Sequence, residues 1–201
     1  QVAEILRNTD NLFNPIINSS TVDFEALNTY ANQLYLLIKP AFVQKTDVVE
    51  NALVTEIDKR LCYSPIESQM TEFKIGISDF KTGEYNQNVV KKIAKTLVAM
   101  ANVTSAAEHG MIILGIADSR EQYLDWRKVY DQQAQIIAQH YVPGVQAEAN
   151  KLYNSVDNYF RFLRKEITKL KISRKLKNYI LETFRVIDYH GVQLVVFDVV
   201  Y

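Results

Sequence analysis

Glu67-Ser-Gln-Met-Thr-Glu-Phe-Lys-Ile-Gly-Ile77 ends in a run that alternates apolar and polar residues. In a β-strand this alternation places Phe73 and the two isoleucines on one face, and Glu72 and Lys74 on the other. A second stretch, Gly110-Met-Ile-Ile-Leu-Gly-Ile-Ala-Asp118, is an apolar run that ends at a carboxylate. The two stretches predict strands that carry charged groups at sheet edges.

Carboxylates beside a lysine are the groups that a divalent-metal phosphodiesterase needs. Oxygen ligands hold Mg²⁺ or Mn²⁺, and a cation balances the negative charge of a phosphate. The residues alone therefore select Glu72, Lys74 and Asp118 as a candidate site. A Glu and a Lys two residues apart on a strand are also common on a solvated face, so a purely structural role stays open.

The composition is that of an ordinary globular protein, with 48% hydrophobic and 23% charged residues among 201. The formal net charge is zero, which excludes a chain that binds nucleic acid through its overall charge. The single cysteine, Cys62, excludes an internal disulfide and a cysteine-based zinc site. The sequence has neither an apolar run of transmembrane length nor a signal peptide, so we expect no membrane partner and a cytoplasmic location.

Both ends of the sequence lead us to expect a fragment of a longer protein. The chain starts at Gln1 without a methionine, and it stops at Tyr201 directly after the strand-like run 194–200. Further chain normally covers or continues a strand with a full apolar complement. We therefore expect additional domains beyond these residues.

Local patterns predict a helical N-terminal segment, residues 1–62, and a mixed domain, residues 63–201. Caps and helical spacing predict helices at about 21–40, 46–61, 88–100, 119–141, 146–169 and 173–183. Strands are predicted at about 70–77 and 111–117, with a closing hairpin of 184–189 and 192–200. The predicted class is α+β: a small mixed sheet with covering helices, the N-terminal helical segment, and a helical insertion at about 119–169.

The apolar residues of the predicted strands are expected to contribute to one buried sheet face. They are Phe73, Ile75, Ile77, Ile113, Ile116, Val195 and Phe197. The helix at 89–100 should pack on this face, because its apolar residues keep helical spacing.

Charge is nearly all positive between residues 161 and 177, where Glu166 is the only acid. Aromatic residues are interleaved with these cations, a combination typical of contact with a phosphate backbone. A solubilising helix face is the alternative reading. The candidate nucleic-acid-binding residues are Arg161, Arg164, Lys165, Lys169, Lys171, Arg174, Lys175 and Lys177.

The order of these features resembles that of Schlafen/AlbA-type domains. Their opening motif is similar to Glu67-x4-Glu72-Phe-Lys74. Their following helix and apolar strand resemble Val98-Ala-Met-Ala-Asn102 and Leu114-Gly-Ile-Ala-Asp118, and their final strand–turn–strand resembles the run from Ile180 to Val199. The resemblance covers roughly residues 63–118 and 170–200.

In the nuclease-competent members of that family, three acids form a metal-dependent endoribonuclease centre. Carried over position by position, these acids match Glu67, Glu72 and Asp118, and Lys74 follows the second acid. The resemblance therefore implies four catalytic residues, with Mg²⁺ or Mn²⁺ held by the three acids. Glu67 rests on the resemblance alone, because a spacing of five places it on the opposite face of a regular strand from Glu72.

Two functions follow. The first is a metal-dependent nuclease acting on RNA, with DNA not excluded. The second is a non-catalytic nucleic-acid-binding or transcription-regulatory module that uses the basic helices. RNA or DNA is the expected partner in both cases, self-association into a homo-oligomer stays open, and a protein-interaction scaffold built on residues 1–62 is a weaker third reading. The first two functions can be distinguished by whether the three carboxylates lie within metal-bridging distance of one another in the fold.

Overall fold

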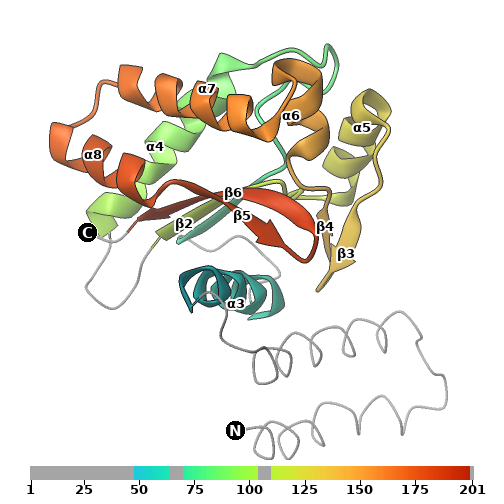
Figure 1. Cartoon of the computed structure of the whole chain (residues 1–201), viewed down its shortest axis with the longest axis horizontal. Helices are drawn as coiled ribbons and strands as arrows, with labels where there is room; N and C mark the ends of the chain where they lie inside the picture. The colour runs from blue at the N-terminus through green and yellow to red at the C-terminus, as the bar shows by residue number, and fades with distance from the viewer. Residues whose placement is uncertain (1–47, 64–69, 104–109, 200–201) are drawn as a thin grey trace, which may run out of the picture. The chain divides into compact units, whose positions relative to one another are not determined.

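The computed structural model of the protein describes residues 48–63, 70–103 and 110–199 (Figure 1). The described residues divide into two compact units: helix α3 (Val48–Tyr63) lies in one, and the strands and helices around the candidate site lie in the other. Helix α3 agrees with the predicted helix at 46–61, whereas the predicted helix at 21–40 lies outside the described residues. No described helix is long and apolar enough to cross a membrane.

The site-bearing unit is built on a four-stranded mixed sheet. Its strands are β1 (Thr71–Lys74), β2 (Gly110–Leu114), β5 (Arg185–Tyr189) and β6 (Val192–Val199). Their spatial order is β1-β2-β6-β5, with β1 parallel to β2 and the other two pairs antiparallel. The predicted α+β class with a small mixed sheet is confirmed, as is the closing hairpin of β5 and β6.

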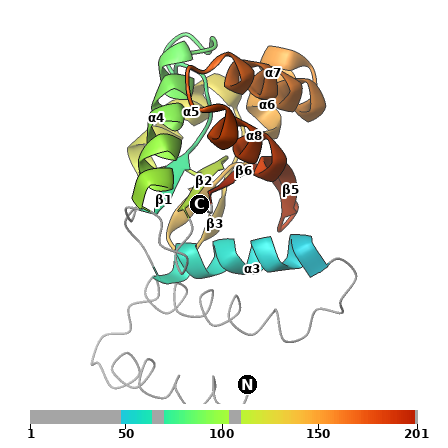
Figure 2. The same cartoon turned by 90° about the vertical axis from the view of Figure 1, so that its left-hand side faces the viewer.

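Helices cover one face of this sheet. Helix α4 (Gln87–Val103) contacts β2 and β6, and α8 (Arg174–Thr183) contacts β6. Helix α7 (Val156–Lys169) packs against α8 and against α6 (Gln146–Tyr153), as Figures 1 and 2 show. The core between the helices and the sheet is apolar and includes Ile93, Leu97, Ile112, Leu114, Leu163, Ile180, Val195 and Phe197.

The prediction of one shared sheet face is wrong. Phe73 pairs with Ile113, whereas Phe197 pairs with Ile112, the preceding residue of β2. Successive side chains of a strand point to opposite faces, so Phe73 and Ile113 lie on the face opposite Phe197. All four side chains are buried. Strand β2 is apolar throughout, and such a run carries no alternation that would assign its residues to a face.

Two predicted helices are also interrupted. The one predicted at 119–141 ends early as α5 (Arg120–Tyr130), because Asp131 adopts a left-handed conformation with φ 47°. Strands β3 (Gln135–Ile137) and β4 (His140–Val142) then form a two-stranded sheet. The one predicted at 146–169 divides into α6 and α7 at Asn154, where φ is 63°. Aspartate and asparagine tolerate this conformation better than other non-glycine residues.

Candidate functional site

The candidate site lies where β1 and β2 end. The two strands are parallel, so their carboxyl ends meet at the same edge of the sheet. The backbone oxygen of Lys74 accepts the N–H groups of Gly115, at 2.7 Å, and Ile116, at 3.3 Å. Gly115 makes this turn with φ 103°, a conformation that favours glycine. The turn returns the chain toward Lys74, so that the carboxylate of Asp118 reaches the ammonium group of Lys74.

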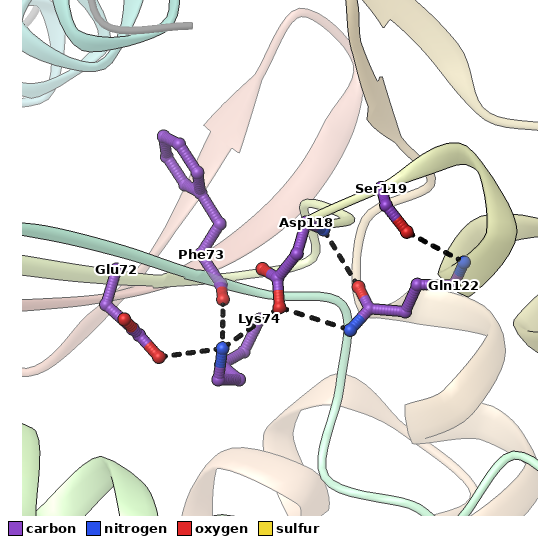
Figure 3. Close-up of polar contacts among 6 residues, drawn as sticks. All are labelled: Glu72, Phe73, Lys74, Asp118, Ser119 and Gln122. Carbon is purple, nitrogen blue, oxygen red and sulfur yellow. Dashed lines mark hydrogen bonds and ion pairs between the residues drawn. The ribbon is translucent and has the colours of Figure 1, made fainter. Parts of the chain in front are cut away.

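The ammonium group of Lys74 is shared by two acids (Figure 3). Its Nζ lies 2.7 Å from Glu72 Oε1 and 3.1 Å from Asp118 Oδ2, and it donates to the backbone oxygen of Phe73 at 2.7 Å. The side chains are partly shielded: Lys74 is 17% exposed, Glu72 25% and Asp118 30%. Because register places Glu72 and Lys74 opposite Ile112 and Leu114, this cluster faces the helix-covered side of the sheet.

Burial alone would lower the pKa of Lys74. The hydrogen bond to Glu72 and the charge of Asp118 outweigh that effect, so the pKa of Lys74 is raised above its ordinary value of 10.5. The ammonium therefore stays protonated at neutral pH. A permanent positive charge between two carboxylates is what this part of the site offers a ligand.

Gln122 orients Asp118 from the first turn of α5 (Figure 3). Its amide nitrogen donates to Asp118 Oδ2 at 3.2 Å, and its amide oxygen accepts the backbone N–H of Asp118 at 2.8 Å. The backbone N–H of Gln122 in turn donates to Ser119 Oγ at 3.2 Å, which caps the helix. The sequence prediction missed Gln122, although Ser119-x-x-Gln122 is a capping-box pattern that was available to find it.

Glu148, on α6, supports the chain that follows β1. Its carboxylate accepts the backbone N–H groups of Ile77, at 3.0 Å, and Ser78, at 2.7 Å, and the hydroxyl of Tyr159 at 2.8 Å. The side chain is fully buried. Burial raises the pKa of Glu148, although these hydrogen bonds act against the rise. No local sequence signal marks Glu148, because its backbone partners lie 70 and 71 residues away.

A cavity of about 360 Å³ opens beside the acids and the lysine. Lysines, carboxylates and amides line it together with backbone of the 75–80 segment. Its polar lining residues are Lys74, Ser78, Asp79, Lys81, Asn86, Lys92, Asp118, Gln122 and Asp125. Three lysines in one small cavity next to a carboxylate pair suit a ligand that carries both a phosphate and a cation.

The structure brings three of the four predicted catalytic residues together: Glu72, Lys74 and Asp118. Glu67, the fourth, lies outside the described residues. Across residues 48–63, 70–103 and 110–199, no group of three or more His, Cys, Asp or Glu side chains gathers as a metal site would. The donor set nevertheless fits Mg²⁺ or Mn²⁺ chemically, because Mg²⁺ commonly binds one or two carboxylates and completes its shell with water and substrate phosphate.

The predicted basic run is divided between α7, α8 and their connection. Arg164 donates to the backbone oxygen of Leu181 at 3.2 Å, Lys177 donates to that of Thr168 at 2.9 Å, and Lys169 pairs with Glu166. The side chains of Arg161, Arg164, Lys165, Lys169, Lys171, Arg174 and Lys175 are exposed, and that of Lys177 is half-buried. Their role in nucleic-acid binding stays a prediction.

Comparison with known proteins gives one family. The family model described as Schlafen, AlbA_2 matches residues 67–200, which is more than half of the chain. Neither the curated proteins nor the solved structures yielded a match. The matched range contains every residue of the site described above, together with α4 and the basic helices.

Proposed function

This chain belongs to the Schlafen AlbA_2 family, and on that premise we propose that it is a metal-dependent nuclease that cleaves RNA. The family suggests a nucleic-acid-related function. One observation supports the step to a nuclease: Glu72 and Asp118 meet at a single ammonium, that of Lys74, where two parallel strands end beside a cavity lined by both lysines and aspartates.

Each side chain takes a role that its surroundings favour. Glu72 and Asp118, with Glu67, would hold Mg²⁺ or Mn²⁺, which supplies Lewis acidity at a phosphate and lowers the pKa of a water molecule when bound. No described residue donates to Glu72 Oε2 or Asp118 Oδ1, so each acid keeps an oxygen for a ligand beside the one engaged by Lys74. Gln122 fixes the direction of the Asp118 carboxylate.

Lys74 acts on the substrate side of the site. Its ammonium stays charged at neutral pH and lines the cavity, where it balances negative charge on the phosphate that undergoes cleavage. A positive group held in place before the reaction needs no reorganisation as charge develops, which is why such groups lower the barrier. The exposed cations of α7 and α8 supply contacts to the RNA backbone outside the cavity.

One observation favours a second function, a non-catalytic nucleic-acid-binding or regulatory module. Lys74 already neutralises one oxygen of each acid, so the two carboxylates are stable beside each other without a metal ion. In that case Glu72 and Asp118 hold Lys74 in position, and the lysine contacts phosphate without cleavage. DNA is the alternative substrate or partner in both cases.

A cleavage assay tests the proposal. Transfer RNA and single-stranded DNA are incubated with the wild-type chain in Mn²⁺, in Mg²⁺ and in chelator. We expect RNA cleavage that requires the metal and disappears in Glu72→Gln and in Asp118→Asn. Glu84→Gln is the matched control, because Glu84 is an exposed acid whose own side chain does not line the cavity. RNA that is bound but never cleaved contradicts the nuclease and favours the binding module.

A further inference from the structure

A second hollow, of about 800 Å³, lies between the amino-terminal half of α4 and the connection from α7 to α8. Four lysines line it: Lys91, Lys92 and Lys95 from α4, and Lys171 from the connection. The other described residues of the lining are Asn86, Asn88, Ala94, Val98, Leu170 and Ile172, so its described part contains no acid. We name this hollow the α4 groove.

We propose that the α4 groove binds the phosphate backbone of an RNA strand that leads into the carboxylate site. This inference rests on the proposed function, since it adds a binding subsite to the same substrate. The lining favours a polyanion because its described residues carry four positive charges and no negative one. Its apolar residues, among them Val98 and Ile172, give riboses or bases a surface that a free phosphate ion would not use.

The four lysines of the groove are available for a ligand. All of them are exposed, and none of their side chains makes a hydrogen bond or an ion pair with another residue in the described part of the chain. Other cations on this unit are already engaged: Lys169 pairs with Glu166, and Lys128 lies 2.7 Å from Asp125. A lysine without an intramolecular partner loses no protein contact when it meets a phosphate.

Helix geometry aligns these lysines in a row. Lys91 lies four residues before Lys95 and Lys92 lies three residues before it, so all three are on the side of α4 away from its buried residues Ile93 and Leu97. Lys91 and Lys95 are separated by about 6 Å along the helix axis, given a rise of 1.5 Å per residue. A row of cations with this repeat can follow successive phosphates of one strand.

The groove is continuous with the candidate site. Asn86 and Lys92 line both the α4 groove and the cavity that contains Lys74 and Asp118. A strand that lies along α4 therefore passes Lys92 before its next phosphate reaches the carboxylates. The α4 groove would set the position of the scissile phosphate by holding its neighbours on one side.

The test measures RNA binding without cleavage, in the presence of chelator. The probes are transfer RNA and a short single-stranded RNA, and the variant is Lys91→Ala/Lys95→Ala. The matched control is Arg120→Ala/Arg127→Ala, which also removes two exposed cations from a helix, α5, and neither residue lines either hollow. We expect the groove variant to bind about tenfold more weakly at low salt. The slope of log affinity against log salt should fall by roughly 1.4, since each single-strand phosphate contact adds about 0.7.

A second measurement uses the wild-type chain and avoids any effect of substitution on folding. Lysine acetylation is followed by mass spectrometry with and without the short RNA. We expect protection at Lys91, Lys95 and Lys171, which come from both walls of the groove, and no protection at Lys128. Equal binding by the two double variants, or equal acetylation of the groove lysines with and without RNA, overturns the inference. If the groove variant binds RNA more weakly but the wild-type chain never cleaves RNA, the nuclease proposal is contradicted and the proposal of RNA binding in the α4 groove still holds.

Discussion

Glu148 occupies the space that a side chain on Gly76 would need. An ideal Cβ on Gly76 would lie 2.3 Å from Glu148 Oε2 and 2.5 Å from Oε1. The backbone of Gly76 has no positive φ, so glycine is required here for close approach and not for an unusual conformation. The pair fixes the segment directly after β1, and this segment lines the cavity beside Lys74.

Gly76→Ala should therefore destabilise the protein by about 1–3 kcal/mol, the usual cost of overpacking a core. The added methyl group forces the Glu148 carboxylate away from the N–H groups of Ile77 and Ser78. Urea denaturation measures the change in unfolding free energy. In the double variant Gly76→Ala/Glu148→Ala the added methyl group has room. The sum of the two single-variant losses in unfolding free energy should therefore be clearly larger than the loss measured for the double variant. Strictly additive costs would mean that Glu148 does not occupy this space.

The pH dependence of stability tests the burial of Glu148. Its pKa is raised in the folded protein, so the unfolded chain releases this proton first as the pH rises above 4.5. Its contribution to stability therefore falls as the pH rises from the unfolded pKa through the folded pKa. Glu148→Gln keeps the shape of the neutral acid and cannot ionise. The unfolding free energy of the variant, compared with that of the wild type, should rise between acidic and neutral pH. A constant difference would contradict the raised pKa.

Part of this site could be predicted from local pattern, and the rest depends on tertiary contacts. Glu72 and Lys74 follow from alternation in β1, and Asp118 follows from its place after an apolar strand. Glu148 could not be predicted, since only the folding of α6 onto the 76–78 segment gives its carboxylate partners. The lysines of α4 were also missed, because they are spread through an amphipathic helix and form no continuous run of charge.

The same distinction explains the errors in the fold. Helical spacing continues across Asp131 and Asn154, so periodicity predicts uninterrupted helices there. The breaks come from single residues with φ of 47° and 63°, and each is an Asp or Asn that tolerates the left-handed conformation. Those residue types permit a break without requiring one, which is why the pattern alone did not place it.

Gln122→Ala should reduce cleavage through its effect on the orientation of Asp118. The substitution removes both hydrogen bonds that orient Asp118, one to its Oδ2 and one from its backbone N–H. We expect kcat to fall about tenfold or more while KM changes little, because the substrate contacts remain. Gln122→Glu should be more harmful still, since it replaces the donor to Asp118 with a second negative charge. Steady-state kinetics with Mn²⁺ distinguish these outcomes, and a rise in KM with unchanged kcat would assign Gln122 to substrate binding.

Exposed cations of the basic helices should contribute to RNA affinity without sequence preference. Arg161→Ala/Lys165→Ala/Arg174→Ala removes three exposed cations whose side chains make no hydrogen bond or ion pair with another described residue. Phosphate contacts carry charge but no base information, so affinity should fall by a similar factor for unrelated sequences. In binding titrations with single-stranded RNA over a range of salt, the slope of log affinity against log salt should be smaller by about 2 in the variant. An unchanged slope would restrict RNA contact to the α4 groove and the cavity.

Lys74→Met tests whether Glu72 and Asp118 can hold a metal ion in place of the ammonium. Methionine fills similar space without charge, so it leaves the two acids facing each other. Without metal, the variant should lose about 1 kcal/mol of unfolding free energy, a modest value for partly exposed ion pairs. This loss should be constant near neutral pH, because the raised pKa keeps Lys74 charged there, and it should shrink only above about pH 10.5, as wild-type Lys74 deprotonates.

Mn²⁺ should then stabilise Lys74→Met more than it stabilises the wild type, since a dication replaces the missing charge and no longer competes with an ammonium. Denaturation of both chains with and without Mn²⁺ measures this difference, and it requires no cleavage activity. Lys74→Met/Asp118→Asn is the control that should lose the extra stabilisation, because it keeps only one of the two described carboxylates. If Mn²⁺ stabilised neither Lys74→Met nor the wild type, these acids would serve to position Lys74, as the binding module requires.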